Sequence, residues 1–116
     1  MPNQQQPSAN ATIEWAPYTL KDGIDESDLI QAATDVETQF LKQQPGYLQR
    51  QLLKGKDNQW VDLVFWQSEQ AAAQAGRSIM QSPFCLKYFA MMQEMDDPNA
   101  APPAHYQVIK HWNLTN

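Results

Sequence analysis

The sequence predicts one α+β domain in which strands and helical regions follow one another in the order β-α-β-β-α-β. Segments rich in strand-forming residues alternate with segments whose apolar residues recur at steps of three and four. A chain of 116 residues is long enough to bury one core without covalent staples. The single cysteine excludes an intrachain disulfide framework, and one thiol with two histidines is too few for a usual structural zinc site.

The first strand is predicted at residues 12–20, TIEWAPYTL, because β-branched and aromatic residues dominate this run and the turn KDG follows it. Pro17 lacks a backbone donor, which predicts a bulge or a locally unpaired position. Residues 1–11 are mostly Gln, Asn, Pro, Ser and Ala, so we expect a disordered tail before a domain over residues 12–116.

The first helix is predicted from Asp25 to the turn at Pro45-Gly46, where the apolar residues change to helical spacing. Asp25 or Ser27 can cap its free N–H groups. The apolar stripe consists of Leu29, Ile30, Ala33, Val36, Phe40 and Leu41.

A β-hairpin is predicted from residues 47–54 and 60–67, joined by GKDNQ, in which Asp57 and Asn58 tolerate positive φ. If these two form the turn centre, Leu53 lies opposite Asp62. One face then carries Tyr47, Gln49, Gln51, Leu53, Trp60, Asp62, Val64 and Trp66, and the other carries Leu48, Arg50, Leu52, Val61, Leu63 and Phe65. Large apolar residues stand on both faces, so both need covering.

The second helical region is predicted at SEQAAAQAG, with Ser68 as N-cap, and starts again at Pro83 after a weak point at Gly76. The loop DDPNAAPPA leads to a final strand, HYQVIKHW, over residues 105–112. This order of elements predicts a ferredoxin-like plait with a four-stranded antiparallel sheet.

A second copy of the chain is expected because a plait of this size covers only one side of its sheet with helices. We assign Tyr47, Leu53, Trp60, Val64 and Trp66 to the bare side, where they form an apolar patch larger than monomers tolerate. The same face of a second copy is the economical cover, which gives a twofold homodimer. The alternative is a cleft between sheet and helices with polar residues turned in.

Three motifs carry a resemblance to a known family: PGYLQRQLL, then WVDLVFWQSEQAAAQA, then SPFCLKYF. In this order and spacing, over about residues 12–112, the chain resembles the dimeric α/β-barrel superfamily, and within it the proteins related to antibiotic biosynthesis monooxygenases. The resemblance implies a homodimer of ferredoxin-like plaits. It does not fix a reaction, since relatives include cofactor-free oxygenases, haem degraders, isomerases and ligand-sensing modules.

The haem-degrading branch of that superfamily uses an Asn, a Trp and a His, and the resemblance places Ala16, Ala75 and Phe89 at these positions. None of the three matches, and Phe89 cannot ligate iron. We therefore expect no haem and, more generally, no cofactor and no metal.

The cofactor-free branch implies an apolar pocket, a few orienting polar groups and a base. Strand alternation can turn several polar residues inward, and a histidine beside a carboxylate can accept a proton near neutral pH. The candidate catalytic residues are His111, Glu14 and Asp62, and the candidate pocket residues are Tyr18, Arg50, Trp66 and Phe89. The structural alternatives are an Arg50–Asp62 ion pair, edge or solvated histidines, and aromatic residues that only fill the core or the dimer interface.

Two classes of function remain open. One is a cofactor-independent monooxygenase-like enzyme, or a related isomerase or decarboxylase, acting on a small aromatic or polyketide-like molecule. The other is a non-catalytic dimer that binds a small ligand or takes part in a stress response. With a net charge of −5 and eight scattered Lys and Arg, the chain has no basic stripe, so nucleic acid and membranes are not expected partners. No secretory signal is evident, which predicts a cytoplasmic location.

Overall fold

The computed structural model describes residues 10–114, and its elements follow the predicted order. They are β1 (Thr12–Thr19), α1 (Glu26–Gln39), β2 (Tyr47–Lys54), β3 (Gln59–Trp66), α2 (Glu69–Ser78), α3 (Pro83–Phe89) and β4 (Ala104–Gln107). The sheet has the order β2-β3-β1-β4, and every neighbouring pair is antiparallel. The predicted ferredoxin-like plait is therefore confirmed, with the second helical region divided into α2 and α3.

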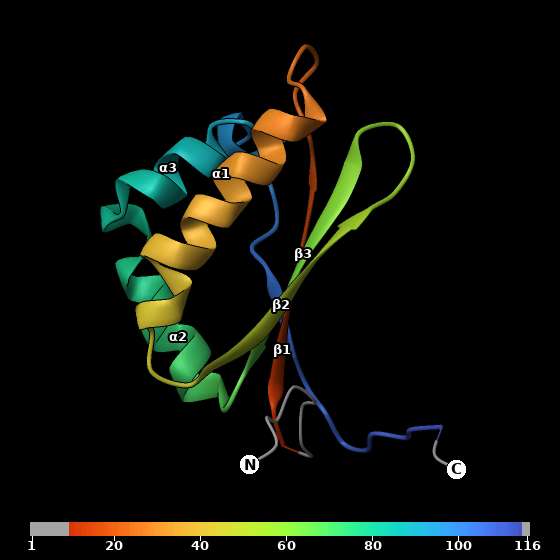
Figure 1. Ribbon diagram of the computed structural model, residues 1–116, viewed down its shortest axis with the longest axis vertical. Helices are drawn as coiled ribbons and strands as arrows, with labels where there is room; N and C mark the ends of the chain where they lie inside the picture. Colours follow the sequence, from red (N-terminus) through yellow and green to blue (C-terminus); the bar gives the residue numbers. More distant parts are fainter. Residues whose placement is uncertain (1–9, 115–116) are drawn as a thin grey trace.

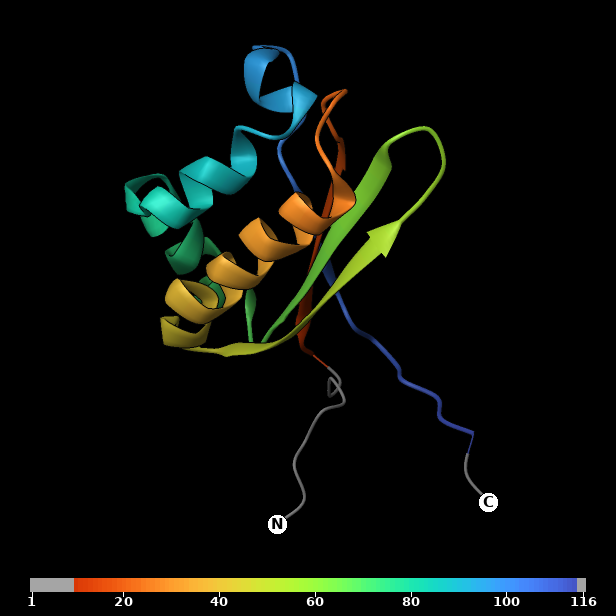
Figure 2. The same ribbon diagram turned by 45° about the horizontal axis from the view of Figure 1, so that its top comes forward.

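Within residues 10–114, the three α-helices lie on one side of the sheet and the other side carries no helix (Figures 1 and 2). We call the helix side the covered face and the other side the open face. The core lies between the covered face and the helices, where Leu29 of α1, Trp66 of β3, and Cys85 and Tyr88 of α3 are almost fully buried. Among the described residues, no helix is long and apolar enough to cross a membrane.

The helices begin where the sequence predicts. The Ser68 hydroxyl accepts a hydrogen bond from the Ala71 N–H at 3.1 Å, and the Ser82 hydroxyl accepts one from the Cys85 N–H at 3.2 Å. Asp25 occupies the N-cap of α1 without a side-chain cap bond. The buried residues of α1 include Leu29, Ala33 and Val36 from the predicted stripe, whereas Ile30 of that stripe is exposed.

The hairpin register differs from the prediction by one residue. Asp57 and Asn58 have positive φ, as expected, but Leu53 pairs with Val61 and not with Asp62. The loop closes at Gly55, whose N–H donates to the Gln59 carbonyl at 2.7 Å. The loop is therefore one residue longer than the assumed turn, which exchanges the two faces of β2 relative to β3.

This shift corrects the composition of the two faces. Trp60, Val64 and Trp66 point into the core and are buried, and Tyr47 donates a hydrogen bond to Glu37 of α1 at 2.7 Å. Their assignment to the bare side was wrong, whereas Leu53 does lie on the open face. The other apolar residues of the open face follow from the register as Ile13, Trp15, Val61, Leu63, Phe65 and Tyr106.

Two further details of the sheet differ from the sequence-based expectation. The register between β1 and β3 continues unbroken through Pro17, so the predicted bulge is absent there. Because β4 pairs only with Thr12 to Trp15, β1 has no partner strand on that side at Pro17, which is the unpaired alternative. β4 ends at Gln107, five residues before the predicted end of the final strand.

The amino-terminal boundary of the domain includes residues that we assigned to a tail. Ala11 is buried, and the Asn10 N–H donates to the Val108 carbonyl at 2.8 Å. Residues 1–9 of the predicted tail lie outside the described residues. The segment before β1 and the segment after β4 therefore run beside each other.

Candidate functional site

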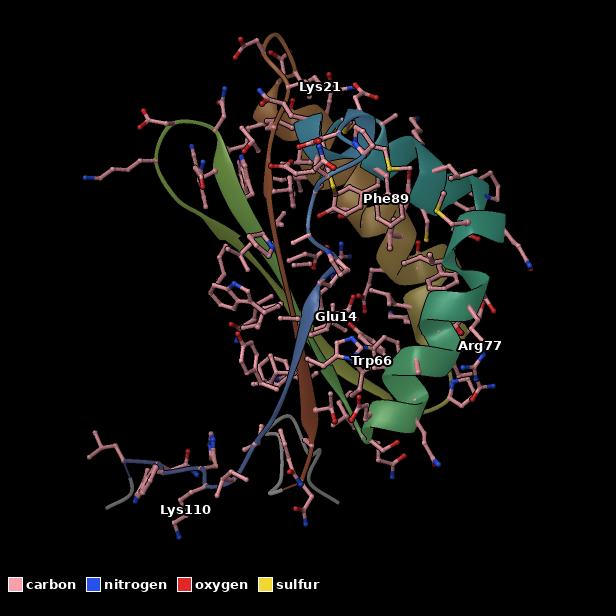
Figure 3. The ribbon with its side chains drawn as sticks, turned by 180° about the vertical axis from the view of Figure 1, so that it is seen from behind. Glu14, Lys21, Trp66, Arg77, Phe89 and Lys110 are labelled. Atoms are coloured by element: carbon pink, nitrogen blue, oxygen red, sulfur yellow. The ribbon has the colours of Figure 1, made fainter. Side chains whose placement is uncertain are left out.

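A cavity of about 330 Å³ lies between the covered face and the helices. Strand residues Glu14, Tyr18, Arg50, Asp62 and Trp66 line it from the sheet, and Tyr88 and Phe89 line it from α3. Figure 3 shows Glu14 and Trp66 on the helix side of the sheet, with Phe89 directed from α3 toward the same space. Methionines, alanines and the proline-rich 100–103 segment complete a mainly apolar wall. We call this space the covered-face cavity.

One wall of the cavity holds a chain of polar side chains. Arg50 forms a bidentate pair with Asp62, from Nε to Oδ1 at 2.7 Å and from Nη2 to Oδ2 at 2.8 Å. The Tyr88 hydroxyl donates to Asp62 Oδ2 at 2.8 Å, and the Tyr18 and Tyr88 hydroxyls are 2.9 Å apart. We call these four residues the relay. The Arg50–Asp62 ion pair that the sequence offered as a structural alternative is present.

The relay is buried and makes further contacts with its surroundings. Arg50 Nη1 donates to the Ala33 carbonyl of α1 at 2.6 Å, and the guanidinium lies 5.5 Å from the Tyr88 ring centroid. The Tyr18 and Tyr88 rings meet edge to face. Burial lowers the pKa of Arg50, but the hydrogen bond and charge of Asp62 outweigh it and raise this pKa above its usual value, so the guanidinium stays charged.

Glu14 lies on the same face of β1 as Tyr18 and is not part of the relay. Its Oε1 accepts a hydrogen bond from Trp66 Nε1 at 3.0 Å. Burial raises the pKa of the Glu14 carboxyl above its usual 4.5, while the Trp66 bond and the charge of His105 oppose this rise. A carboxylate in this setting is a better proton acceptor than one in water, which is the property of a general base.

Six of the seven predicted site residues line the covered-face cavity, namely Glu14, Asp62, Tyr18, Arg50, Trp66 and Phe89. His111 does not. It is exposed, lies beyond the end of β4, and contacts Asn113 Oδ1 at 2.9 Å. Figure 3 shows its neighbour Lys110 on the C-terminal segment, away from the helices. The expectation that the final strand extends over residues 105–112 and includes His111 was therefore wrong, because β4 ends at Gln107.

Tyr88 is the site residue that sequence reasoning missed. In the sequence Tyr88 stands among the phenylalanines and methionines of the last helical region, where helical spacing does not separate a core tyrosine from a polar one. Its hydroxyl meets Asp62 because α3 lies on the helix side of the sheet, the side to which Asp62 points. The one usable signal was that a buried tyrosine hydroxyl needs a partner.

The three positions compared with haem degraders, Ala16, Ala75 and Phe89, all line the cavity. None of these side chains offers an iron ligand. Within residues 10–114, no group of three or more His, Cys, Asp or Glu is arranged to hold a metal ion. Cys85 is buried, and burial raises the pKa of its thiol, as expected of a small core residue.

A second hollow of about 530 Å³ follows the edge strand β2 and the side of α1. It is a broad groove lined by Ile30, Glu37, Lys42, Leu48 and Gln49 among others. Glu14, Tyr18 and Trp66 do not reach it. We therefore place the candidate site in the smaller covered-face cavity, where the perturbed carboxyl and the relay face apolar walls.

The fold has solved counterparts, although no family model and no curated protein matches the sequence. The cofactor-independent oxygenase SnoaB from Streptomyces nogalater is 17% identical with a TM-score of 0.65, covering 93% of this chain and 100% of that one. A protein from Nitrosomonas europaea, described as an antibiotic biosynthesis monooxygenase, is 12% identical with a TM-score of 0.60, covering 86% and 91%. One from Shewanella loihica, described as a monooxygenase, is 24% identical with a TM-score of 0.53, covering 91% and 100%.

These likenesses confirm that the chain has the fold of antibiotic biosynthesis monooxygenase-like proteins, as the motifs suggested. At such identities the likeness speaks for the fold alone. What the cavity does must be argued from its own residues.

Proposed function

We propose that the chain is a cofactor-independent, monooxygenase-like enzyme that oxidises a small phenolic or polyketide-like aromatic molecule in the covered-face cavity. The observation that carries this proposal is Glu14, a carboxyl group of raised pKa turned into a mainly apolar cavity of about 330 Å³. The likeness in fold to a cofactor-independent oxygenase supports this reaction over others.

The chemistry needs no outside reductant, because an electron-rich substrate supplies the electrons. Glu14 takes a proton from an acidic CH₂ group, and the resulting carbanion combines with O₂ and takes the same proton back from Glu14 to form C–OOH. Loss of water then leaves a carbonyl group, so that CH₂ and O₂ become C=O and H₂O. The departing water carries the peroxide proton and the second C–H proton, and Glu14 is again a carboxylate.

Activity should depend on pH through Glu14. Only the carboxylate can accept the proton, and burial raises the pKa of this group above 4.5. We therefore expect the rate to rise with pH through an apparent pKa above 4.5 and then to level off.

Oxygen uptake with dihydroxyanthrone, a phenolic tricycle with one acidic CH₂ group, tests the proposal. Wild-type protein should consume one O₂ for each quinone formed, and Glu14→Gln should lose about 100-fold or more of the rate, the usual share of a general base. Gln keeps an oxygen that can accept the Trp66 N–H bond, so binding of the substrate should persist. Glu69→Gln, an exposed change in α2, is the control and should leave the rate unchanged.

The proposal fails if wild-type and Glu14→Gln proteins consume O₂ equally, or if wild type does no better than buffer. Binding without turnover would favour the alternative function, a non-catalytic ligand-binding dimer. One observation favours that alternative: the two tyrosine hydroxyls of the relay are already engaged in hydrogen bonds, which suits holding a ligand more than moving its protons. A cytoplasmic location remains a prediction from the sequence.

We also propose that the chain acts as a twofold homodimer through the open face. Trp15 is 39% exposed and Tyr106 58% exposed there, beside Leu53 and Leu63. No helix of the described chain lies on that side of the sheet (Figure 2). A second copy presents the same apolar face and buries both patches at once.

A further inference from the structure

We propose that the covered-face cavity selects neutral aromatic ligands that present a hydrogen-bond donor, such as a phenolic hydroxyl, to Tyr18 Oη, and that Tyr88 and Asp62 impose this choice. The inference rests on the cavity proposed above as the site. It specifies the ligand class, and it holds whether or not the ligand is oxidised.

The direction of every proton in the relay follows from Asp62. Both carboxylate oxygens accept N–H bonds from Arg50, so Asp62 has no proton to give. The Tyr88 hydroxyl must then donate its single proton to Asp62 Oδ2, 2.8 Å away. The Tyr88 oxygen is left with lone pairs only.

Tyr18 is the end of this chain. Its hydroxyl lies 2.9 Å from that of Tyr88, whose proton is already given to Asp62, so Tyr18 must donate to Tyr88. Among the described residues, Tyr18 Oη makes no other hydrogen bond. What it offers to the cavity is therefore an acceptor, and a ligand group that meets it must donate.

The tyrosines keep these protons at neutral pH. Burial raises the pKa of Tyr18 to about 12, against the lowering effect of its bond with Tyr88. Burial, followed by the charge of Asp62, raises the pKa of Tyr88 further above its usual value. Each hydroxyl thus carries one proton, which the argument about direction requires.

The charges that line the cavity disfavour an anionic ligand. Arg50 is the one basic residue among the lining residues, and it is bound to Asp62 and to the Ala33 carbonyl. Glu14 and Glu94 add carboxyl groups to the lining. A ligand carboxylate would find no available cation and would face acidic neighbours, so the preferred ligand is neutral.

The test compares β-naphthol with its methyl ether by isothermal titration calorimetry. The two share the aromatic ring system, but only the naphthol can donate a hydrogen bond. We expect wild-type protein to bind the naphthol roughly 3- to 10-fold more tightly, the value of one neutral hydrogen bond in a buried site. The ratio of the two dissociation constants is the measured quantity.

Two variants separate the acceptor from the residue that orients it. Tyr18→Phe removes the acceptor, so the preference should fall to about onefold, with the affinity for the ether retained. Tyr88→Phe keeps Tyr18 but frees its proton, so Tyr18 can donate to the ether oxygen, and the preference should shrink or reverse. A purely structural role for Tyr88 would weaken both ligands equally and leave the ratio intact.

Tyr47→Phe is the matched control, since Tyr47 also donates to a buried-side carboxylate, Glu37 at 2.7 Å, but lies outside the cavity lining. This variant should leave the ratio as in wild type. Circular dichroism checks that each variant is folded. If a variant does not fold, the ratio of the two dissociation constants measured for wild-type protein still tests the inference.

Three results would overturn the inference. They are equal binding of both ligands by wild type, an unchanged ratio in folded Tyr88→Phe, and no binding of either ligand. Oxygen uptake separates this inference from the proposed function. A preference for the hydrogen-bond donor without oxygen uptake would refute the oxygenase and support the inference. Oxygen uptake without such a preference would support the oxygenase and refute the inference.

Discussion

The two faces of one sheet differ in what they bury. The covered face carries charged and hydroxyl side chains, Glu14, Arg50, Asp62 and Tyr18, around a cavity beneath the helices. The open face carries apolar side chains such as Trp15, Leu63 and Tyr106 and has no helix over it (Figure 2). Ordinary amphipathic sheets show the reverse, with the polar face toward water.

This inversion teaches that each face needs a different complement. A buried polar cluster is stable only if its groups satisfy one another, as the relay does. A bare apolar face is stable only if another surface covers it. The polar cluster finds its hydrogen-bond partners within the chain, whereas a cover for the apolar face implies a second copy.

The largest effect should follow a charge placed on the open face. Leu63→Glu should convert the proposed dimer to monomer, because each copy loses about 1.5–3 kcal/mol of apolar burial, or about 3–6 kcal/mol for the pair. Light scattering after gel filtration measures the mass. Ala73→Glu on the exposed side of α2 is the control. A wild-type protein that is already monomeric at micromolar concentration would refute the dimer.

The next effect tests the polar cluster of the covered face. Asp62→Ala should lower the free energy of unfolding by about 3–5 kcal/mol, because Arg50 is left buried without its partner. Glu26→Ala breaks the exposed Lys54–Glu26 pair, also 2.7 Å long, and should cost less than about 1 kcal/mol. Urea denaturation of both variants at one protein concentration gives the comparison. Equal losses would mean that burial does not distinguish the pairs.

A smaller effect should appear in the pH dependence of stability. Because burial raises the Glu14 pKa above 4.5, the folded protein holds this proton at a pH where the unfolded chain has lost it. Wild-type stability should therefore fall as pH rises from 4.5 through the folded pKa, relative to Glu14→Gln. Unfolding at a series of pH values measures this difference. A wild-type stability that stays constant or rises relative to Glu14→Gln over this pH range would contradict the buried carboxyl.

The smallest effect is expected with haemin. The cavity positions Ala16, Ala75 and Phe89 carry no iron ligand, and the two histidines are exposed, one on β4 and one beyond it. We expect no sharp Soret shift on titration. A sharp shift that His105→Ala or His111→Ala abolishes would move the candidate site toward the C-terminal segment.

The sequence was sufficient for the element order, because each strand and helix has its own period and its own stop signal. The pairing register was not predictable in the same way. Asp57 and Asn58 tolerate positive φ in loops of two lengths, and one residue of difference changes which face of β2 meets the core. The dimer argument made a separate error, because it assigned Trp60, Val64 and Trp66 to the bare side although all three are buried in the core. A bare apolar face nevertheless exists.

The candidate site was predictable where alternation along a strand decides orientation, as for Glu14, Tyr18 and Asp62. The prediction failed for His111, because strand-forming residues continue in the sequence beyond Gln107, where the pairing of β4 with β1 ends. It also failed for Tyr88, whose role depends on a contact between residues 26 positions apart. Tertiary contacts of this kind leave no local pattern.

A crystal structure of the protein with β-naphthol tests the division between the two faces most directly. We predict that the ligand lies between the covered face and the helices, with its hydroxyl within hydrogen-bond distance of Tyr18 Oη, while two open faces pack against each other in a twofold dimer. A ligand bound on the open face, or an open face left bare with the cavity collapsed around the relay, would contradict this account.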